Sequence, residues 1–282
     1  MLSRREIVSG ATALAACQVL PGDTEAGPVG DRRALLAGKA GNSAAVQQFF
    51  NRLVTLPTAS RQALYANLIN ALVSGGVWAF GDALWVAGND AATTLTNLIN
   101  GTTTAAISGV PTFTANRGFT CNSSVNIITT NFNPSTGGQN FTQNSGSLGA
   151  WELTSFTPAS EIDFIRTVGG ANEYVYVTTG PSGGAILSST GFVVGTSTGT
   201  TGWFFGDRSS SSLQTVYQNN SSLATNATAS QAPENGVLLW WGNAAGGGQQ
   251  HAAIWFGASL TTGQQTTLYN ALQTYLHALG AV

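Results

Sequence analysis

Two carboxylates that alternate along one predicted strand are the clearest candidates for chemistry in this chain. Glu161 and Asp163 lie in the segment Glu161-Ile162-Asp163-Phe164-Ile165-Arg166. Alternate side chains of a strand point to the same face, so the two acids share one face. Retaining glycosidases use two carboxylates about 5 Å apart, one as nucleophile and one as acid. The pair raises the hypothesis of glycoside hydrolysis, against the simpler interpretation of an edge strand with two solvated acids and a neighbouring arginine.

Tryptophans and one charged dipeptide form the candidate ligand-binding set. An exposed indole can stack on a pyranose, although most tryptophans in a sandwich fill the core. Trp240 and Trp241 are adjacent, so on a strand they face opposite sides and one of them faces outward. Trp203 and the dipeptide Asp207-Arg208 complete the set. The simpler interpretation of Asp207-Arg208 is a salt bridge at a turn.

The remaining reactive side chains form no recognisable motif. His251 and His277 have no cysteine partner at metal-site spacing and no serine or aspartate at catalytic spacing. Ser209 to Ser212 reads as a loop. We therefore predict no metal site and no cofactor.

The charge balance argues against nucleic acid as a partner. Charged residues make up 8% of the chain and its net charge is -2. From Asp82 onward, three arginines face eight acids. A phosphate backbone requires a basic surface, so nucleic acid and an anionic membrane are both poor partners. With 35 glycines and 9% aromatic residues, the composition favours a β-rich exported or virion protein.

The amino terminus has the features of an export signal. Arg4-Arg5 precedes a weakly apolar stretch over residues 10–16, which is too short to span a bilayer. We interpret residues 1–26 as a twin-arginine or lipoprotein-like signal and residues 27–43 as a linker. Leu14-Ala15-Ala16-Cys17 resembles a lipobox, which predicts a lipid anchor at Cys17. The alternative is an amino-terminal helix that is never cleaved. If Cys17 is lipidated or removed, Cys121 is left as a lone thiol, which we expect to be buried as a small hydrophobic residue.

The predicted elements are a helical pair over residues 44–78 and a β-sandwich with a terminal helix over residues 79–282. The first helix covers 44–54, and the second begins at Thr58 or Ser60 and ends at Gly75-Gly76. Ser259 is the expected N-cap of the terminal helix. Short apolar runs between turn residues predict the strands: 82–87, 113–115, 125–129, 141–148, 150–156, 162–166, 173–178, 192–195, 201–207, 213–217, 237–241 and 251–256. The fold class is therefore mainly β, a two-sheet antiparallel jelly-roll sandwich.

Three segments resemble a known family of domains. They are Pro111 to Phe119, the helix end from Leu68 to Trp78, and Ala253 to Thr261 with the helix that follows. Together they resemble the concanavalin A-like (laminin-G-like) jelly rolls of bacteriophage and prophage virion proteins. The resemblance covers roughly residues 44–282 and implies a surface module that binds glycans, or contacts other virion or cell-surface proteins, as a homo-oligomer. It also implies calcium at a loop rim, although no Asp/Asn cluster stands out for it.

Family 16 glycoside hydrolases share the jelly roll and carry a Glu-x-Asp-x-(x)-Glu strand. By that resemblance Glu161 matches the nucleophile and Asp163 the assisting carboxylate. The acid position falls on Ile165, or on Arg166 if the strand is bulged, and arginine cannot protonate a leaving oxygen. The sequence therefore favours a non-catalytic recognition module for a polysaccharide or cell-surface glycan. A hydrolase, live or degenerate, and an architectural virion decoration protein are the alternatives.

Overall fold

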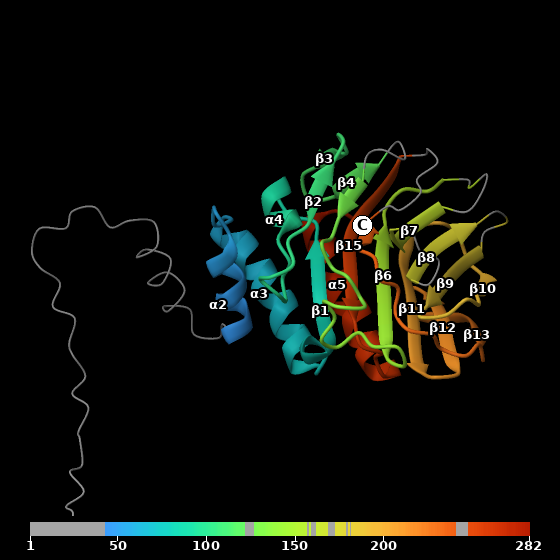
Figure 1. Cartoon of the computed structure of the whole chain (residues 1–282). Helices are drawn as coiled ribbons and strands as arrows, with labels where there is room; N and C mark the ends of the chain where they lie inside the picture. Colours follow the sequence, from blue (N-terminus) through green and yellow to red (C-terminus); the bar gives the residue numbers. More distant parts are fainter. Residues whose placement is uncertain are drawn as a thin grey trace, which may run out of the picture. The chain divides into compact units, whose positions relative to one another are not determined.

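Two antiparallel sheets face each other in the computed structural model of the protein, which describes residues 43–121, 127–156, 158, 162–168, 173–178, 180, 182–240 and 248–282. A pair of helices precedes the strands and one helix follows them (Figure 1). The mainly β sandwich predicted from the sequence is confirmed. The interpretation of residues 1–42 as a signal and linker lies outside the described residues.

The first sheet is organised around β15 (Gln249–Gly257). One edge of β15 pairs with β6 (Gly146–Glu152), and the other pairs with β4 (Gly118–Cys121) and then β1 (Gly81–Val86). The sheet order is β13 (Ser221–Asn226), β12 (Leu213–Gln218), β11 (Gly202–Ser210), β6, β15, β4 and β3 (Thr112–Thr114).

The second sheet covers the inner face of the first. Its order is β10 (Val193–Thr196), β9 (Ser182–Leu187), β8 (Glu173–Thr178), β7 (Ile162–Thr167), β14 (Leu238–Trp240), β5 (Ile127–Thr129) and β2 (Ala106–Ser108). Since β7 lies between β8 and β14, the expectation that it is an edge strand is wrong.

The core fills the space between the sheets. Alternate residues of each strand point inward, and the buried ones come from both sheets. Phe164 on β7 meets Phe204 on β11 edge to face, with 5.3 Å between ring centroids. Phe256 on β15 stacks on Phe132 at 5.4 Å. Burial of this apolar surface is the main stabilising contribution to the sandwich.

The helices pack on one another beside and behind the first sheet (Figure 1). The helices α2 (Ala44–Arg52) and α3 (Ala59–Ser74) match the predicted pair. Tyr65 of α3 contacts Tyr275 of α5 (Thr262–Leu279), with ring centroids 5.4 Å apart. The Tyr275 hydroxyl donates to the Ala87 carbonyl at 2.7 Å, which ties α5 to the end of β1.

The N-cap of α5 is Thr261, so the assignment to Ser259 is wrong. The Thr261 side chain accepts from the Gln264 backbone N–H, and the Gln264 side chain accepts from the Thr261 N–H. This reciprocal pair is a capping box, which satisfies two helix-end donors at once. Ser259 instead donates to the Asp207 carboxylate at 2.9 Å.

Strand prediction failed where glycine or polar residues build the sheet. The two predicted strands 141–148 and 150–156 are replaced by a single strand over 146–152, β6, because Gly149 is an interior position and not a turn. A Cβ there would lie 2.3 Å from the Trp203 ring, so only glycine fits beneath the indole. The sequence interpretation also missed β2, β4, β9, β13 and the short helices η1 (Trp78–Phe80) and α4 (Ala91–Leu95).

Candidate functional site

A hollow of about 330 Å³ lies where the ends of β6 and β11 and the turn after β12 meet α5. We call it the Tyr269 hollow. Its volume is near the lower end of the range for small-molecule sites, roughly 300–1,000 Å³. It is lined by Trp151, Glu152, Leu153, Thr201, Gly202, Asn219, Tyr269, Gln273, Ala281 and Val282.

Stacked aromatic rings form one wall of the Tyr269 hollow. Trp151 and Tyr269 are nearly parallel, at 7° and with centroids 5.6 Å apart. Trp151 in turn contacts Trp203 at 6.1 Å. Trp151 and Trp203 are buried, whereas Tyr269 is half-buried. Tyr269 is therefore the accessible ring of the stack, and its hydroxyl makes no hydrogen bond within the described part of the chain.

Asn219 is held at the hollow by a tight turn. Asn219 and Asn220 have φ values of 48° and 65° and form the two-residue connection between β12 and β13. Positive φ at both central residues is the pattern of a type I′ hairpin, which asparagine tolerates. The Asn219 Oδ1 accepts from the Trp203 backbone N–H at 2.9 Å. Its Nδ2 and the Gln273 amide form no hydrogen bond within the described residues, so both remain available to a ligand.

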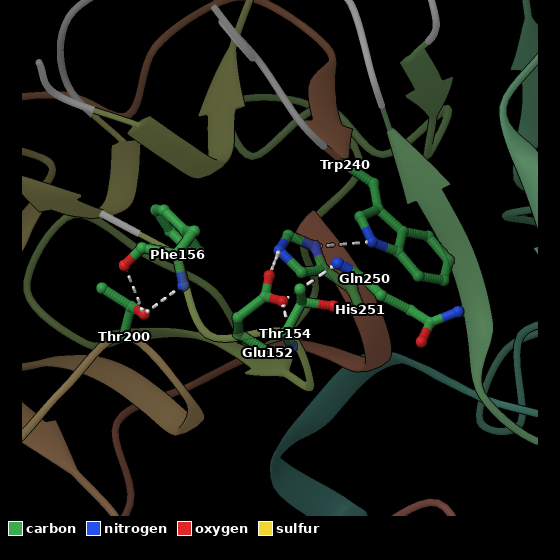
Figure 2. Close-up of polar contacts among 7 residues, drawn as sticks. All are labelled: Glu152, Thr154, Phe156, Thr200, Trp240, Gln250 and His251. Carbon is green, nitrogen blue, oxygen red and sulfur yellow. Dashed lines mark hydrogen bonds and ion pairs between the residues drawn. The ribbon is translucent and has the colours of Figure 1, made fainter. Parts of the chain in front are cut away.

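A buried polar chain begins at Glu152 and crosses to the other sheet (Figure 2). Glu152 Oε2 lies 3.0 Å from His251 Nε2. The Trp240 indole N–H donates to His251 Nδ1 at 2.9 Å. Glu152 Oε1 accepts from the backbone N–H groups of Thr154 and Gln250 at 2.6 and 2.9 Å. Glu152, His251 and Trp240 are all fully buried.

The partners of His251 fix its tautomer. An indole N–H can only donate, so Nδ1 must be the acceptor, and Nε2, which lies 3.0 Å from the Glu152 carboxylate, must carry the proton. Both ring nitrogens are thereby occupied, and neither is left to take a proton from a hydroxyl. A histidine–carboxylate pair resembles part of a catalytic triad, but in this arrangement it links β6, β15 and β14.

The structure places Asp163 in a buried ion pair. Asp163 is 1% exposed and forms an ion pair with Arg166 at 3.0 Å. The Arg166 guanidinium lies 5.0 Å from the Tyr174 ring centroid. Glu161, its proposed partner, lies outside the described residues, as does Trp241. The interpretation of Asp163 as a solvated acid is wrong.

The predicted ligand-binding residues of β11 are covered. Trp203 is 2% exposed and its ring contacts Trp151 and Phe205, so its faces are not open to a ligand. Asp207 accepts from the Ser259 hydroxyl and from the Leu260 N–H at 3.0 Å, and it thereby anchors the start of α5. Burial raises the pKa of Asp207 to about 6.

Asp207 and Arg208 form no salt bridge, which corrects the predicted turn pair. They lie within β11, so their side chains point to opposite faces. Arg208 is fully buried and donates to the carbonyls of Leu187, Ser210 and Thr228.

Sequence reasoning missed Tyr269 and Asn219 as site residues. Tyr269 lies among the apolar residues of the terminal helix, so the sequence gives it no separate signal. The Asn219-Asn220 dipeptide was the available signal, since two asparagines favour a hairpin turn. Among the described residues, no group of three or more His, Cys, Asp or Glu side chains could hold a metal ion. None of the described helices is long and apolar enough to cross a membrane.

Solved structures of similar fold include β-sandwich proteins, and the likeness concerns the fold alone. The ligand-binding domain of botulinum neurotoxin serotype D, solved in complex with N-acetylneuraminic acid, is 12% identical with a TM-score of 0.51. The match covers 71% of this chain and 52% of that one. A structure of botulinum neurotoxin type C, whose cell entry depends on two ganglioside molecules, is 14% identical with a TM-score of 0.53. It covers 68% of this chain and 52% of that one.

A sialidase of Trypanosoma rangeli in complex with a difluoro-KDN compound is 8% identical with a TM-score of 0.54. The match covers 76% of this chain and 40% of the sialidase, so this chain spans about half or less of the length of these proteins. No protein-family model and no curated protein matches the sequence.

Proposed function

We propose that this protein is a non-catalytic recognition module that binds a polysaccharide or cell-surface glycan. The observation that carries the proposal is the Tyr269 hollow, in which one accessible aromatic ring lies beside uncharged amide groups. Aromatic faces bind the apolar face of a pyranose, and amides both donate to and accept from hydroxyl groups.

The hollow supplies the contacts that a neutral sugar requires. Tyr269 offers a ring already held in place by Trp151 at 5.6 Å, so little side-chain entropy is lost on binding. Asn219 is fixed by its bond to Trp203, and its free Nδ2 can donate to a hydroxyl. Gln273, one turn along α5 from Tyr269, can donate and accept. A single sugar ring with several hydroxyl groups fits this chemistry.

Two observations support recognition without bond cleavage. The Glu152–His251 pair is fully buried, and both nitrogens of its histidine are engaged. Asp163 is buried and held by Arg166, so its carboxylate is already compensated. General acid–base catalysis requires a group within hydrogen-bond reach of the substrate, and neither acid has that access in this arrangement.

We place the module outside the cytoplasm, as part of an exported or virion protein. This part of the proposal rests on the Arg4-Arg5 leader and on the uncharged composition. Sandwiches of similar fold occur in proteins that bind sialic acid or gangliosides, which agrees with a glycan ligand without identifying it.

A glycan array tests the proposal. Wild-type protein should bind at least one neutral glycan, and Tyr269→Ala should lose that binding. Thr274→Ala, an exposed change on α5 that does not line the Tyr269 hollow, should bind like the wild type. Absence of binding to every neutral glycan on a broad array, or equal binding of a neutral glycan by Tyr269→Ala, would count against the proposal.

A further inference from the structure

Two adjoining hollows lie beside α2 and α4, and the Tyr269 hollow shares no lining residue with them. Their volumes are about 910 and 500 Å³, within the range of ligand sites. Both are lined by Arg52, Asn100 and Gly101, so Arg52 stands at their common border. We call the two together the Arg52 cleft.

Arg52 is fixed at this border by the backbone of the facing loop. It is the last residue of α2, and its Nη2 donates to the carbonyls of Asn97 and Leu98 at 2.9 and 2.6 Å. Gly101 permits this approach, since a Cβ there would lie 2.9 Å from the Arg52 Cδ. The Arg52 Nη1 forms no hydrogen bond with the described residues, and it is not buried. A preorganised guanidinium thus presents a free donor to the cleft.

The two acids that line the cleft are occupied by other donors. Asp82 is 4% exposed and accepts three backbone N–H groups, from Gln139, Asn140 and Phe141, at 2.8 to 3.0 Å. Asp90 caps α4 by accepting from the backbone N–H and hydroxyl of Thr93 at 2.7 and 2.9 Å. Within the described residues Arg52 forms no ion pair. Among these residues its charge is therefore compensated by carbonyl dipoles and by the Phe49 ring, 6.0 Å from its guanidinium carbon, and not by a carboxylate.

The rest of the lining is rich in uncharged groups that donate and accept hydrogen bonds. The smaller hollow has five carboxamides, and those of Gln48 and Gln139 are exposed and make no hydrogen bond within the described residues. The larger hollow adds threonine hydroxyls. One cation among amides and hydroxyls, with both lining acids already engaged by other donors, matches a ligand with one negative group and many hydroxyls. A nucleic-acid backbone would require several cations along its path.

We propose that the Arg52 cleft is a second saccharide site, specific for a sugar that carries a carboxylate. The carboxylate accepts from Arg52 Nη1, and the sugar hydroxyls bind the amides of Gln48 and Gln139. The Arg52 cleft adds selectivity for an anion that the Tyr269 hollow lacks, since no cationic side chain is among the described residues that line that hollow. It stands on residues independent of that hollow, so either proposal can fail alone.

Calorimetric titration with three acidic probes tests this site: oligogalacturonate, oligoglucuronate and an N-acetylneuraminyl oligosaccharide. At least one should bind, and esterification of its carboxylate should weaken binding at least about tenfold, since a charge-assisted hydrogen bond is lost. Gln139→Ala should weaken binding severalfold with no change in melting temperature. Tyr269→Ala should leave binding to the acidic probe unchanged.

Arg52→Lys separates charge from folding, because it keeps the cation while losing the fixed fork. It should retain weakened, still ester-sensitive binding, even if Arg52→Gln fails to fold. The proposal is overturned if none of the three probes binds, if acid and ester bind equally, or if Gln139→Ala has no effect. Loss of acid binding in Tyr269→Ala would also overturn it, by placing the ligand in the other hollow.

Discussion

The indole N–H of Trp240 donates to Nδ1 of His251 at 2.9 Å, from a strand of one sheet to a strand of the other. Glu152 holds the opposite nitrogen of the same ring. A sandwich core is otherwise held by non-directional apolar contacts. This polar link specifies how β14 and β15 align, because each of its members would be left unsatisfied by a shift.

Trp240→Phe should destabilise the fold, because it leaves a buried acceptor without a hydrogen-bond donor. The change leaves His251 Nδ1 without its indole donor, which costs about 1–3 kcal/mol beyond the lost ring volume. The matched control is Trp255→Phe, since Trp255 is equally buried and donates to a serine hydroxyl that can reorient. Urea unfolding of both variants measures the difference. Equal losses in the two variants would contradict the role assigned to the link.

Asp207 should make the stability depend on pH. Its folded pKa is raised from 3.8 to about 6 by burial, so the folded state favours the protonated acid. The contribution is fully present below about pH 4 and is lost as pH rises through about 6. The free energy of unfolding of wild type minus that of Asp207→Asn should therefore fall by up to about 3 kcal/mol over this range.

Glu173→Gln provides the contrast for this pH test. Burial raises the pKa of Glu173 to about 7. The free energy of unfolding of wild type minus that of Glu173→Gln should therefore continue to fall until about pH 7. A difference for Asp207→Asn that rises with pH, or stays flat from pH 4 to 7, would rule out the buried, protonated acid.

Gly149→Ala should destabilise the protein through overpacking. The added methyl group would lie 2.3 and 2.4 Å from two carbons of the Trp203 ring, and an overfilled site typically costs about 1–3 kcal/mol. Gly263→Ala in the first turn of α5 is the control, because nothing lies within 4 Å of its added Cβ. It should leave stability unchanged or raise it by up to about 1 kcal/mol. Melting temperatures that fall equally in both variants would refute the packing account.

Elements with a strong local signal could be predicted from the sequence. The run over 173–178 matches β8 at both ends because its β-branched and aromatic residues have no competing interpretation. The strand β9 was missed because Gly183 and Gly184 suggest a turn. In the sheet, a Cβ at Gly184 would lie 2.2 Å from the Tyr176 ring. The requirement for glycine comes from a residue of the neighbouring strand, so the sequence around Gly184 does not reveal it.

The candidate site was less predictable than the fold. Glu152 and His251 are brought together by the pairing of β6 with β15, and no spacing in the sequence indicates it. Trp203 was proposed to face a ligand, but its side of the sheet is covered. Tyr269 of α5 stacks on Trp151 of β6, and Trp151 contacts Trp203. The face of the sheet on which a terminal helix packs is set by tertiary contacts. That packing leaves Tyr269 as the accessible aromatic ring.

Simultaneous measurement of binding and cleavage tests the account most directly. A glycan that is positive on the array is titrated into the protein while tryptophan emission and released reducing ends are both followed, with Glu161→Gln and Asp163→Asn as parallel samples. Trp151 lies beneath Tyr269, so we predict a saturable change in emission and no release of reducing ends by any of the three proteins. Reducing ends released by the wild type and absent from either variant would contradict it and make the protein a hydrolase.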